Sequence, residues 1–193
     1  MTEGYAAFDD PYLYPDTTIL RNRLDIRDPH QLEAFEVEMT TVRAAEPLPV
    51  GRFGPTHYRR LHHHIFQDVY DWAGRYRTVR TAKGNNVFCY PEHIPAQMNA
   101  LFRQLAVPPL AGGVDFAVFV AAVARLLGEL NAIHPFREGN GRVQLLFLQQ
   151  ITQRAGHPLD LGRVRRESFL PAIIESFHGR FASLVEELSR LRT

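Results

Sequence analysis

The sequence is poor in the features that build disulfide scaffolds, nucleic-acid surfaces and membrane anchors. Cys89 is the single cysteine among 193 residues, which excludes an intramolecular disulfide and is typical of a reducing cytoplasm. The formal net charge is only +1, which is too balanced to indicate a nucleic-acid or membrane surface. There is no internal repeat and no low-complexity tract. We therefore expect a cytoplasmic protein that binds no nucleic acid and no membrane.

Long apolar runs and an N-terminal leader are also missing. Arg125 and Glu129 interrupt the longest apolar stretch, so we expect no membrane-spanning segment. The first ten residues contain acidic side chains and no apolar core, so no signal peptide is expected. Because 45% of the residues are hydrophobic, the chain can bury a real core, and we expect one domain over residues 1–193.

The residues that are present predict a mainly α fold. Asp28 and Pro29 are typical of an N-cap and a first helical position, and they predict a helix that extends to about Ala45. Residues 76–90 place apolar side chains around the sequence Lys-Gly-Asn-Asn, which indicates a β-hairpin with a Gly/Asn turn. Further helices are predicted at about 56–72, 91–105, 115–131 and 143–154.

The most informative segment is His-Pro-Phe-Arg-Glu-Gly-Asn-Gly-Arg at residues 134–142, between two of these helices. A loop that leads into a helix N-terminus presents free N–H groups to a phosphate. His134 can titrate near neutrality and take a proton from a hydroxyl. Glu138 offers the hard oxygen ligand that Mg²⁺ prefers. Arg137 is as readily a surface residue as a site residue.

The other residues of this segment also suit an anion site. Gly139 and Gly141 let the backbone approach a phosphate and tolerate positive φ. The Asn140 amide can donate to a phosphate oxygen, and the Arg142 guanidinium can clamp one. Phe136 is expected to anchor the loop in the core. The segment is therefore a candidate for phosphoryl or nucleotidyl transfer.

Residues 134–142 fill every fixed position of the motif of the Fic (filamentation induced by cAMP) family, His-Pro-Phe-x-(Asp/Glu)-Gly-Asn-Gly-Arg. The chain therefore resembles this family, and residues 10–15 and 68–74 are similar to its toxin-type bacterial members. The resemblance covers most of the chain. It implies one Fic-type helical bundle with a small β-hairpin flap, composed of an N-terminal helical segment 1–50, a flap hairpin 76–90 and an active-site loop 134–142.

The resemblance implies an enzyme that transfers AMP from ATP to a hydroxyl side chain of another protein. His134 would be the general base, and Glu138 would hold Mg²⁺ between the α- and β-phosphates. Residues 139–141 (Gly139, Asn140 and Gly141) would form the anion hole, and Arg142 would clamp the phosphate chain. Positioning and electrostatics would then supply most of the catalysis.

The hairpin resembles the target-docking flap of the family, through Lys83, Gly84 and Phe88. A pair of exposed strands can add a target segment by backbone pairing, which would hold a target hydroxyl over His134. The alternative is a structural hairpin that covers the helical core. Lys83 is the only lysine in the chain, which makes a target or phosphate contact at the turn a reasonable expectation.

One position departs from the family pattern. Leu145 stands where active members carry a second arginine that binds the γ-phosphate. Arg154 and Arg180 are candidates to replace it. The alternatives are a different, diphosphate donor, as in the phosphocholine-transferring members, and a catalytically silent nucleotide-binding interaction module.

The expected partners follow from the same resemblance. The substrate would be a protein, and type II topoisomerase subunits are candidates. The family's inhibitory pattern, (Ser/Thr)-x-x-x-Glu-(Gly/Asn), is incomplete here, because Leu188 follows the nearest match at 183–187. That stretch is more simply an amphipathic C-terminal helix. An inhibitory helix would then come from a separate small antitoxin protein.

Three consecutive histidines at 62–64 suggest a metal site, but their spacing argues against one. Adjacent residues on a helix point about 100° apart, so the three rings cannot converge on one ion. We expect these histidines to be solvated or to pack in the core.

Overall fold

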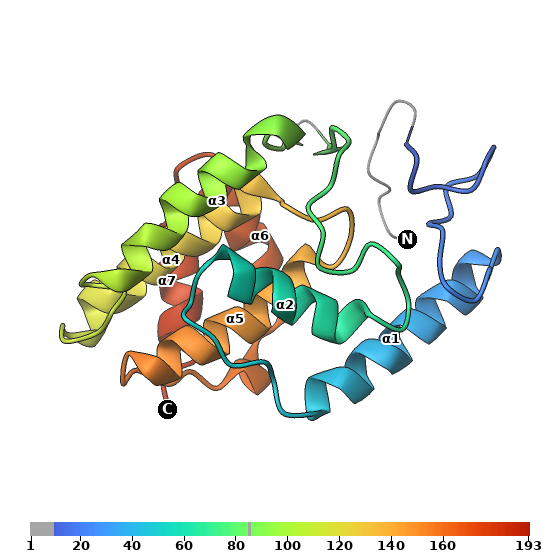
Figure 1. Cartoon of the computed structure of the whole chain (residues 1–193). Coiled ribbons are helices and arrows are strands. Elements are labelled where there is room, and N and C mark those ends of the chain that lie inside the picture. The colour runs from blue at the N-terminus through green and yellow to red at the C-terminus, as the bar shows by residue number, and fades with distance from the viewer. Residues whose placement is uncertain (1–9, 85) are drawn as a thin grey trace.

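The computed structural model describes residues 10–84 and 86–193, and they form a helical bundle (Figure 1). Helix α4 lies at its centre and contacts α3, α5, α6 and α7, while α2 packs against α5 and α3. Helix α1 lies at the edge of the bundle along α2. The prediction of a mainly α fold is confirmed. The α-helices are α1 (Pro29–Ala45), α2 (Pro55–Phe66), α3 (Ile94–Arg103), α4 (Phe116–Ile133), α5 (Asn140–Arg154), α6 (Arg166–Phe177) and α7 (Ala182–Ser189), with 3₁₀ turns η1 (Pro91–His93), η2 (Gln104–Ala106) and η3 (Leu161–Arg163).

The central helix α4 is apolar on most of its surface. By length and composition it is the one helix among the described residues that could cross a membrane, although its charged residues led us to expect none. Half of it is buried inside the molecule, and Arg125 and Glu129 lie on its exposed side. Residues four apart share a helix face, so the two charges mark one solvent-facing stripe. The packing of α4 is that of a core helix.

The prediction of α1 is confirmed at its start, whereas that of α2 is wrong at its end. Asp28 accepts a hydrogen bond from the N–H of Gln31 at 2.8 Å, as the predicted N-cap of α1 should. The prediction that α2 continues to residue 72 was wrong. The helix ends at Phe66, whose carbonyl accepts hydrogen bonds from the next turn, and Asp68 in that turn is bound by Arg43 of α1 at 2.6 Å.

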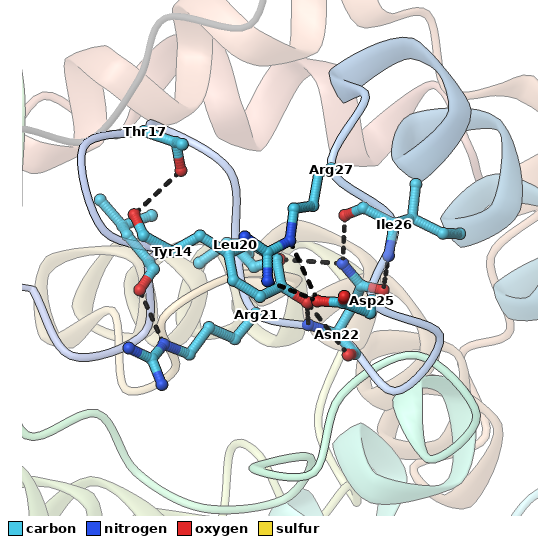
Figure 2. A network of polar contacts seen from close by, with 9 residues as sticks. Tyr14, Thr17, Leu20, Arg21, Asn22, Asp25, Ile26 and Arg27 are labelled. Carbon is cyan, nitrogen blue, oxygen red and sulfur yellow. Dashed lines mark hydrogen bonds and ion pairs between the residues drawn. The ribbon is translucent and has the colours of Figure 1, made fainter.

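The N-terminal segment is helical only from Pro29 onward among the described residues, so the expected helical segment 1–50 is wrong for residues 10–28. Residues 1–9 lie outside the described part. The side chain of Asn22 binds backbone groups of Leu20 and Ile26 and closes the segment into a compact loop (Figure 2). These side-chain bonds to the backbone compete with helix formation.

The hairpin at residues 76–90 is present but shorter than predicted. Strands β1 (Ala82–Lys83) and β2 (Asn86–Val87) pair antiparallel. One further bond, from the Phe88 N–H to the Thr81 carbonyl, continues the pairing at 3.1 Å. Beyond it the strands separate, because the carbonyls of Val79 and Cys89 accept from the buried Arg77 side chain instead of from N–H groups of the opposite strand.

Candidate active site

The loop between α4 and α5 is anchored by two residues of the motif. Phe136 is fully buried, as predicted, and its ring stacks on His62 at 3.8 Å. The Asn140 side chain accepts from the Phe136 N–H at 3.0 Å and donates to the Phe136 carbonyl at 2.8 Å. The amide is thus used to close the loop. We had expected it to donate to a phosphate oxygen, and that role is left to the backbone N–H of Asn140.

The two glycines of the motif differ in backbone conformation and in the space around them. Gly139 has a φ of +81°, and a Cβ there would lie 2.2 Å from Cε2 of Phe66. Gly141 lies inside the first turn of α5 without positive φ, and a Cβ there would meet nothing within 4 Å. Both glycines were expected to tolerate positive φ, and Gly139 is the one of the two that adopts it. Gly141 instead borders open space at the start of the helix.

Helix α5 begins without a side-chain cap, three residues earlier than predicted. Its first backbone hydrogen bond runs from the Val143 N–H to the Gly139 carbonyl at 3.1 Å. The N–H groups of Asn140, Gly141 and Arg142 therefore have no partner within the helix. Together with the helix dipole, they form a candidate anion cradle, and the anion hole expected at residues 139–141 stays a prediction.

Arg142 is held beside this cradle by α1 and α2. Its guanidinium forms an ion pair with Glu36, lies 3.6 Å from Glu138 and lies over the Phe66 ring at 4.7 Å from the centroid. The Tyr70 hydroxyl donates to the second oxygen of Glu36. Sequence reasoning did not identify Glu36 or Tyr70, because a glutamate on a charged helix and a core tyrosine carry no distinguishing pattern.

Glu138 lies at the mouth of the cradle. One carboxylate oxygen accepts from the Gly139 N–H at 2.9 Å, and the side chain is 30% exposed. Burial raises the pKa of Glu138, and the nearby Glu36 carboxylate raises it further. Within residues 10–84 and 86–193 no group of three metal-ligating side chains occurs. A single carboxylate suits Mg²⁺ that takes its remaining ligands from phosphates and water.

His134 is a buried residue in left-handed conformation, with φ 48°, at the C-cap of α4. Burial is the main cause that lowers its pKa from 6.5 to about 3, and the positive charge of Arg77 is the next. Lys83 and Arg137 lower the pKa further, while a hydrogen bond to the Asn131 backbone opposes them. The imidazole is therefore neutral at physiological pH and can accept a proton.

The hairpin covers this histidine. Phe88 stacks on the His134 ring at 3.9 Å with only 10° between the planes, and it is 6% exposed. The Phe88 ring is therefore turned inward onto His134, and its expected role in target docking stays a prediction. Gly84 lies at the exposed turn with a φ of +56°. Lys83 and Gly84 remain predicted target contacts.

Arg137 is an anchor for the loop. Its side chain is 5% exposed and its Nε donates to Asp10 at 2.6 Å, which ties the loop between α4 and α5 to the N-terminal segment. Of the two arginines proposed to replace the one missing at Leu145, Arg154 does not lie there. Arg154 donates to the carbonyls of Leu105 and Leu110. Along the axis of α5 it lies about 18 Å from Arg142. Arg180 lies exposed in the turn between α6 and α7.

His62 is a core histidine, as expected, and it also supports the loop. Its Nδ1 accepts from the Gly74 N–H at 2.9 Å, so Nε2 carries the proton and donates to the Glu138 carbonyl at 3.0 Å. His64 points elsewhere, to the Arg43 carbonyl at 2.8 Å. His63 is exposed, so the three side chains diverge as their helical spacing requires. A lone core histidine gives no sequence signal for this supporting role.

We expect His62→Phe to lower the free energy of unfolding by about 2–6 kcal/mol, because it leaves two buried backbone groups without partners at about 1–3 kcal/mol each. His62→Gln retains one acceptor and one donor and should lose less. Urea unfolding followed by circular dichroism measures both. Equal losses in the two variants would show that ring packing, not the bonds to Gly74 and Glu138, gives His62 its role.

Three comparisons agree on the family. The Fic/DOC family model matches residues 52–152, which is more than half of the chain. A protein of Sinorhizobium fredii, named a probable protein adenylyltransferase, is 48% identical over 97% of this chain and 98% of its own length. A probable protein adenylyltransferase of Escherichia coli is 38% identical over 88% of this chain and 85% of its own length.

A solved structure gives the same result. The BepC effector protein of Bartonella tribocorum with bound AMPPNP aligns with a TM-score of 0.84 and 25% identity, over 94% of this chain and 96% of that one. The loop that joins α4 to α5 carries the complete family motif, and both the fold and the matched length agree with it. The chain belongs to the Fic/DOC family.

Proposed function

We infer that this chain is a protein adenylyltransferase, which moves AMP from ATP to a hydroxyl side chain of another protein. The observation that carries this conclusion is a buried histidine in the same short loop as an uncapped helix N-terminus. Relatives over nearly the whole chain are named protein adenylyltransferases, and a neighbouring structure holds an ATP analogue. A silent binding module has no need of a base held in this way.

In the proposed reaction, the neutral His134 imidazole takes the proton of the target hydroxyl as the hydroxyl oxygen attacks the α-phosphorus. A bond forms between that oxygen and the α-phosphorus, and the bond from the α-phosphorus to the bridging oxygen breaks. Pyrophosphate leaves with the electron pair. The N–H groups at the start of α5 would stabilise the charge on the non-bridging oxygens during this exchange.

Glu138 and Arg142 would bind the phosphate chain. Glu138 would hold Mg²⁺, which neutralises charge on the phosphates when it is bound. Arg142 has N–H groups beyond those that bind Glu36, and its fork can add a phosphate oxygen while α1 keeps it in place. Leu145 lies one turn along the same face of α5, so this face supplies no second arginine. The cradle, Arg142 and the metal would therefore share the phosphates.

The finer assignments are proposals of the same kind. The target is a protein, and type II topoisomerase subunits remain the candidates to test first. A small antitoxin partner is proposed because the nearest inhibitory pattern lies in α7, where Glu187 is engaged by Ser168 at 2.8 Å and by Arg190. A cytoplasmic location is proposed from the single cysteine.

Transfer of label from α-³²P-ATP to proteins of a bacterial lysate tests the function. With Mg²⁺ present, we expect labelled bands that are at least about 100-fold weaker with His134→Ala, because the general base is lost. Glu138→Gln should also remove labelling, and γ-³²P-ATP should give none because its label leaves in pyrophosphate. Labelling that persists in His134→Ala would contradict the role of the base. No label on any protein, including the enzyme, would contradict adenylyl transfer from ATP.

A further inference from the structure

Arg77 is a fully buried cation close to the proposed active site. Only 2% of the residue is exposed, although arginine is almost never fully buried unless its charge and its donors are satisfied. Four of its side-chain hydrogen bonds run to backbone carbonyls. Nε donates to His134 at 2.7 Å, Nη1 to Val79 at 2.6 Å, and Nη2 to Cys89 at 2.6 Å and to Ile133 at 3.2 Å.

These carbonyls belong to two separate parts of the chain. Ile133 and His134 form the end of α4 and the start of the catalytic loop, whereas Val79 and Cys89 lie on the two arms of the hairpin. In Figure 1 the green segment that leads into the hairpin runs beside the gold loop that follows α4. One planar guanidinium with five N–H donors therefore spans both arms and the loop, which a lysine ammonium cannot do.

Two backbone contacts reinforce this junction. The Arg77 N–H donates to the Pro135 carbonyl at 2.9 Å, and the Cys89 N–H donates to the Ala132 carbonyl at 3.0 Å. Phe88, next to Cys89, is stacked on the His134 ring. The base of the hairpin is thus fixed to the residues that hold the catalytic imidazole, while the turn at Gly84 projects outward.

We propose that Arg77 is a positioning residue, which locks the hairpin to the loop of the catalytic base so that an acceptor segment on the hairpin is held in register with His134. This inference rests on the proposed function, because the register matters only if His134 acts on a target hydroxyl. The bimolecular reaction depends on such alignment, and displacement of the hairpin by about 1 Å would reduce the rate about 100-fold.

The charge of Arg77 has a second effect on the same residue. The pKa of His134 is lowered by burial first and by Arg77 next, and the cations Lys83 and Arg137 act in the same direction. Removing the positive charge should therefore raise the pKa of His134, while a lysine at position 77 should retain most of the effect. Comparing these two changes separates the effect of the charge at position 77 from the effect of the hydrogen bonds that the guanidinium donates.

The test compares Arg77→Lys and Arg77→Met with Arg80→Met as the matched control. Arg80 lies in the same segment but is exposed, where it donates to the Tyr90 hydroxyl at 2.9 Å. Hydrogen–deuterium exchange on the intact protein, affinity for AMPPNP, and label transfer to lysate proteins are measured for each variant. Thermal unfolding checks that each variant is folded, and Arg77→Lys decides the result if Arg77→Met fails to fold.

We expect both Arg77 variants to exchange the amides of Phe88 and Cys89 about tenfold faster or more. Label transfer should fall by about tenfold or more, while affinity for AMPPNP changes by less than about threefold, because the cradle at α5 is untouched. Arg80→Met should change neither the exchange of these amides nor the affinity for AMPPNP, because its side chain is exposed and does not bind the loop of His134. In ¹³C-histidine spectra, the titration midpoint of His134 should rise in Arg77→Met and stay low in Arg77→Lys.

Unchanged hairpin exchange and unchanged transfer in a folded Arg77→Lys protein would overturn the proposal. Equal losses of transfer and of AMPPNP affinity would also overturn it, because they would indicate general damage to the site. If the wild-type protein transfers no label, the proposed function fails on its own. Hairpin exchange and the His134 titration still decide whether Arg77 couples the two parts.

Discussion

Replacing Gly141 by alanine should make the protein more stable and nearly inactive. Gly141 lies in the first turn of α5, where alanine is the better helix former by about 0.5–1 kcal/mol. A Cβ at this position meets no protein atom within 4 Å, so packing adds no cost. The methyl group would instead occupy the space beside the N–H groups that are proposed to bind the α-phosphate. Loss of that contact should lower transfer about 100-fold or more.

Gly139→Ala is the matched control, because the same change two residues away should act through the fold. Its Cβ would lie 2.2 Å from the Phe66 ring, on a backbone with φ +81°. The left-handed conformation costs about 1–2 kcal/mol for a residue with a side chain, and the overlap costs about 1–3 kcal/mol. We therefore expect a loss of about 2–5 kcal/mol in the free energy of unfolding, together with loss of activity.

Urea unfolding, AMPPNP affinity and label transfer separate these outcomes. For Gly141→Ala we expect a higher urea midpoint with weaker AMPPNP binding. If Gly141→Ala binds AMPPNP and transfers label as the wild type does, the start of α5 is not the phosphate site. If Gly139→Ala is as stable as the wild type, the Phe66 ring does not constrain the loop as the structure indicates.

The part of the candidate site that the sequence predicts is the part formed by residues that are close together in the chain. Residues 134–142 shape the loop through short-range effects. His134 lies at the end of the apolar helix α4, Pro135 stops that helix from continuing, and Gly139 precedes α5. The buried Phe136 and the uncapped start of α5 follow from this order. The burial of Phe136 and a helix N-terminus after the loop were predicted, and both helices that flank the loop were predicted within three residues.

The residues that support the loop could not be predicted from the sequence. They are far from the loop along the chain, and their residue types occur in many surface and core positions. Glu36 lies 106 residues from Arg142, and Arg77 lies 57 from His134. Nothing in a charged helix or in a basic strand indicates such partners. The same distant contacts explain the wrong expectations, since the carbonyls that would have lengthened the hairpin are bound by Arg77. Phe88 faces inward because the His134 ring offers it a flat apolar surface.

His134 should not be the group that limits activity at low pH. With an ordinary pKa of 6.5, only about 3% of the imidazole would be neutral at pH 5, and kcat/KM would fall about 30-fold. With a pKa of about 3, the imidazole stays neutral and kcat/KM should lose less than about twofold through this residue. The pKa of His134 is lowered and not raised, because burial and neighbouring cations disfavour the charged form of a histidine.

Glu138 has the opposite shift and should set the acid limit instead. Burial and Glu36 raise the pKa of Glu138, so its carboxylate gains a proton earlier than usual as the pH falls. A proton on Glu138 would compete with the Mg²⁺ proposed to bind there, and therefore a higher Mg²⁺ concentration should move the loss of kcat/KM to lower pH. The profile is measured from pH 8 to pH 5 at two Mg²⁺ concentrations. A loss near pH 6.5 that ignores Mg²⁺ would mean that His134 titrates normally.

Phe88→Ala should create such a magnesium-independent loss. Without the stacked ring, water reaches His134 and the pKa returns toward 6.5, so the base becomes protonated as the pH falls below neutrality. Val87→Ala is the control, because this neighbour is 53% exposed and does not cover the imidazole. The hairpin would then have two roles at one residue, since Phe88 keeps the base neutral while the rest of the hairpin presents the acceptor. A Phe88→Ala profile identical to that of Val87→Ala would show that burial by the hairpin does not control the base.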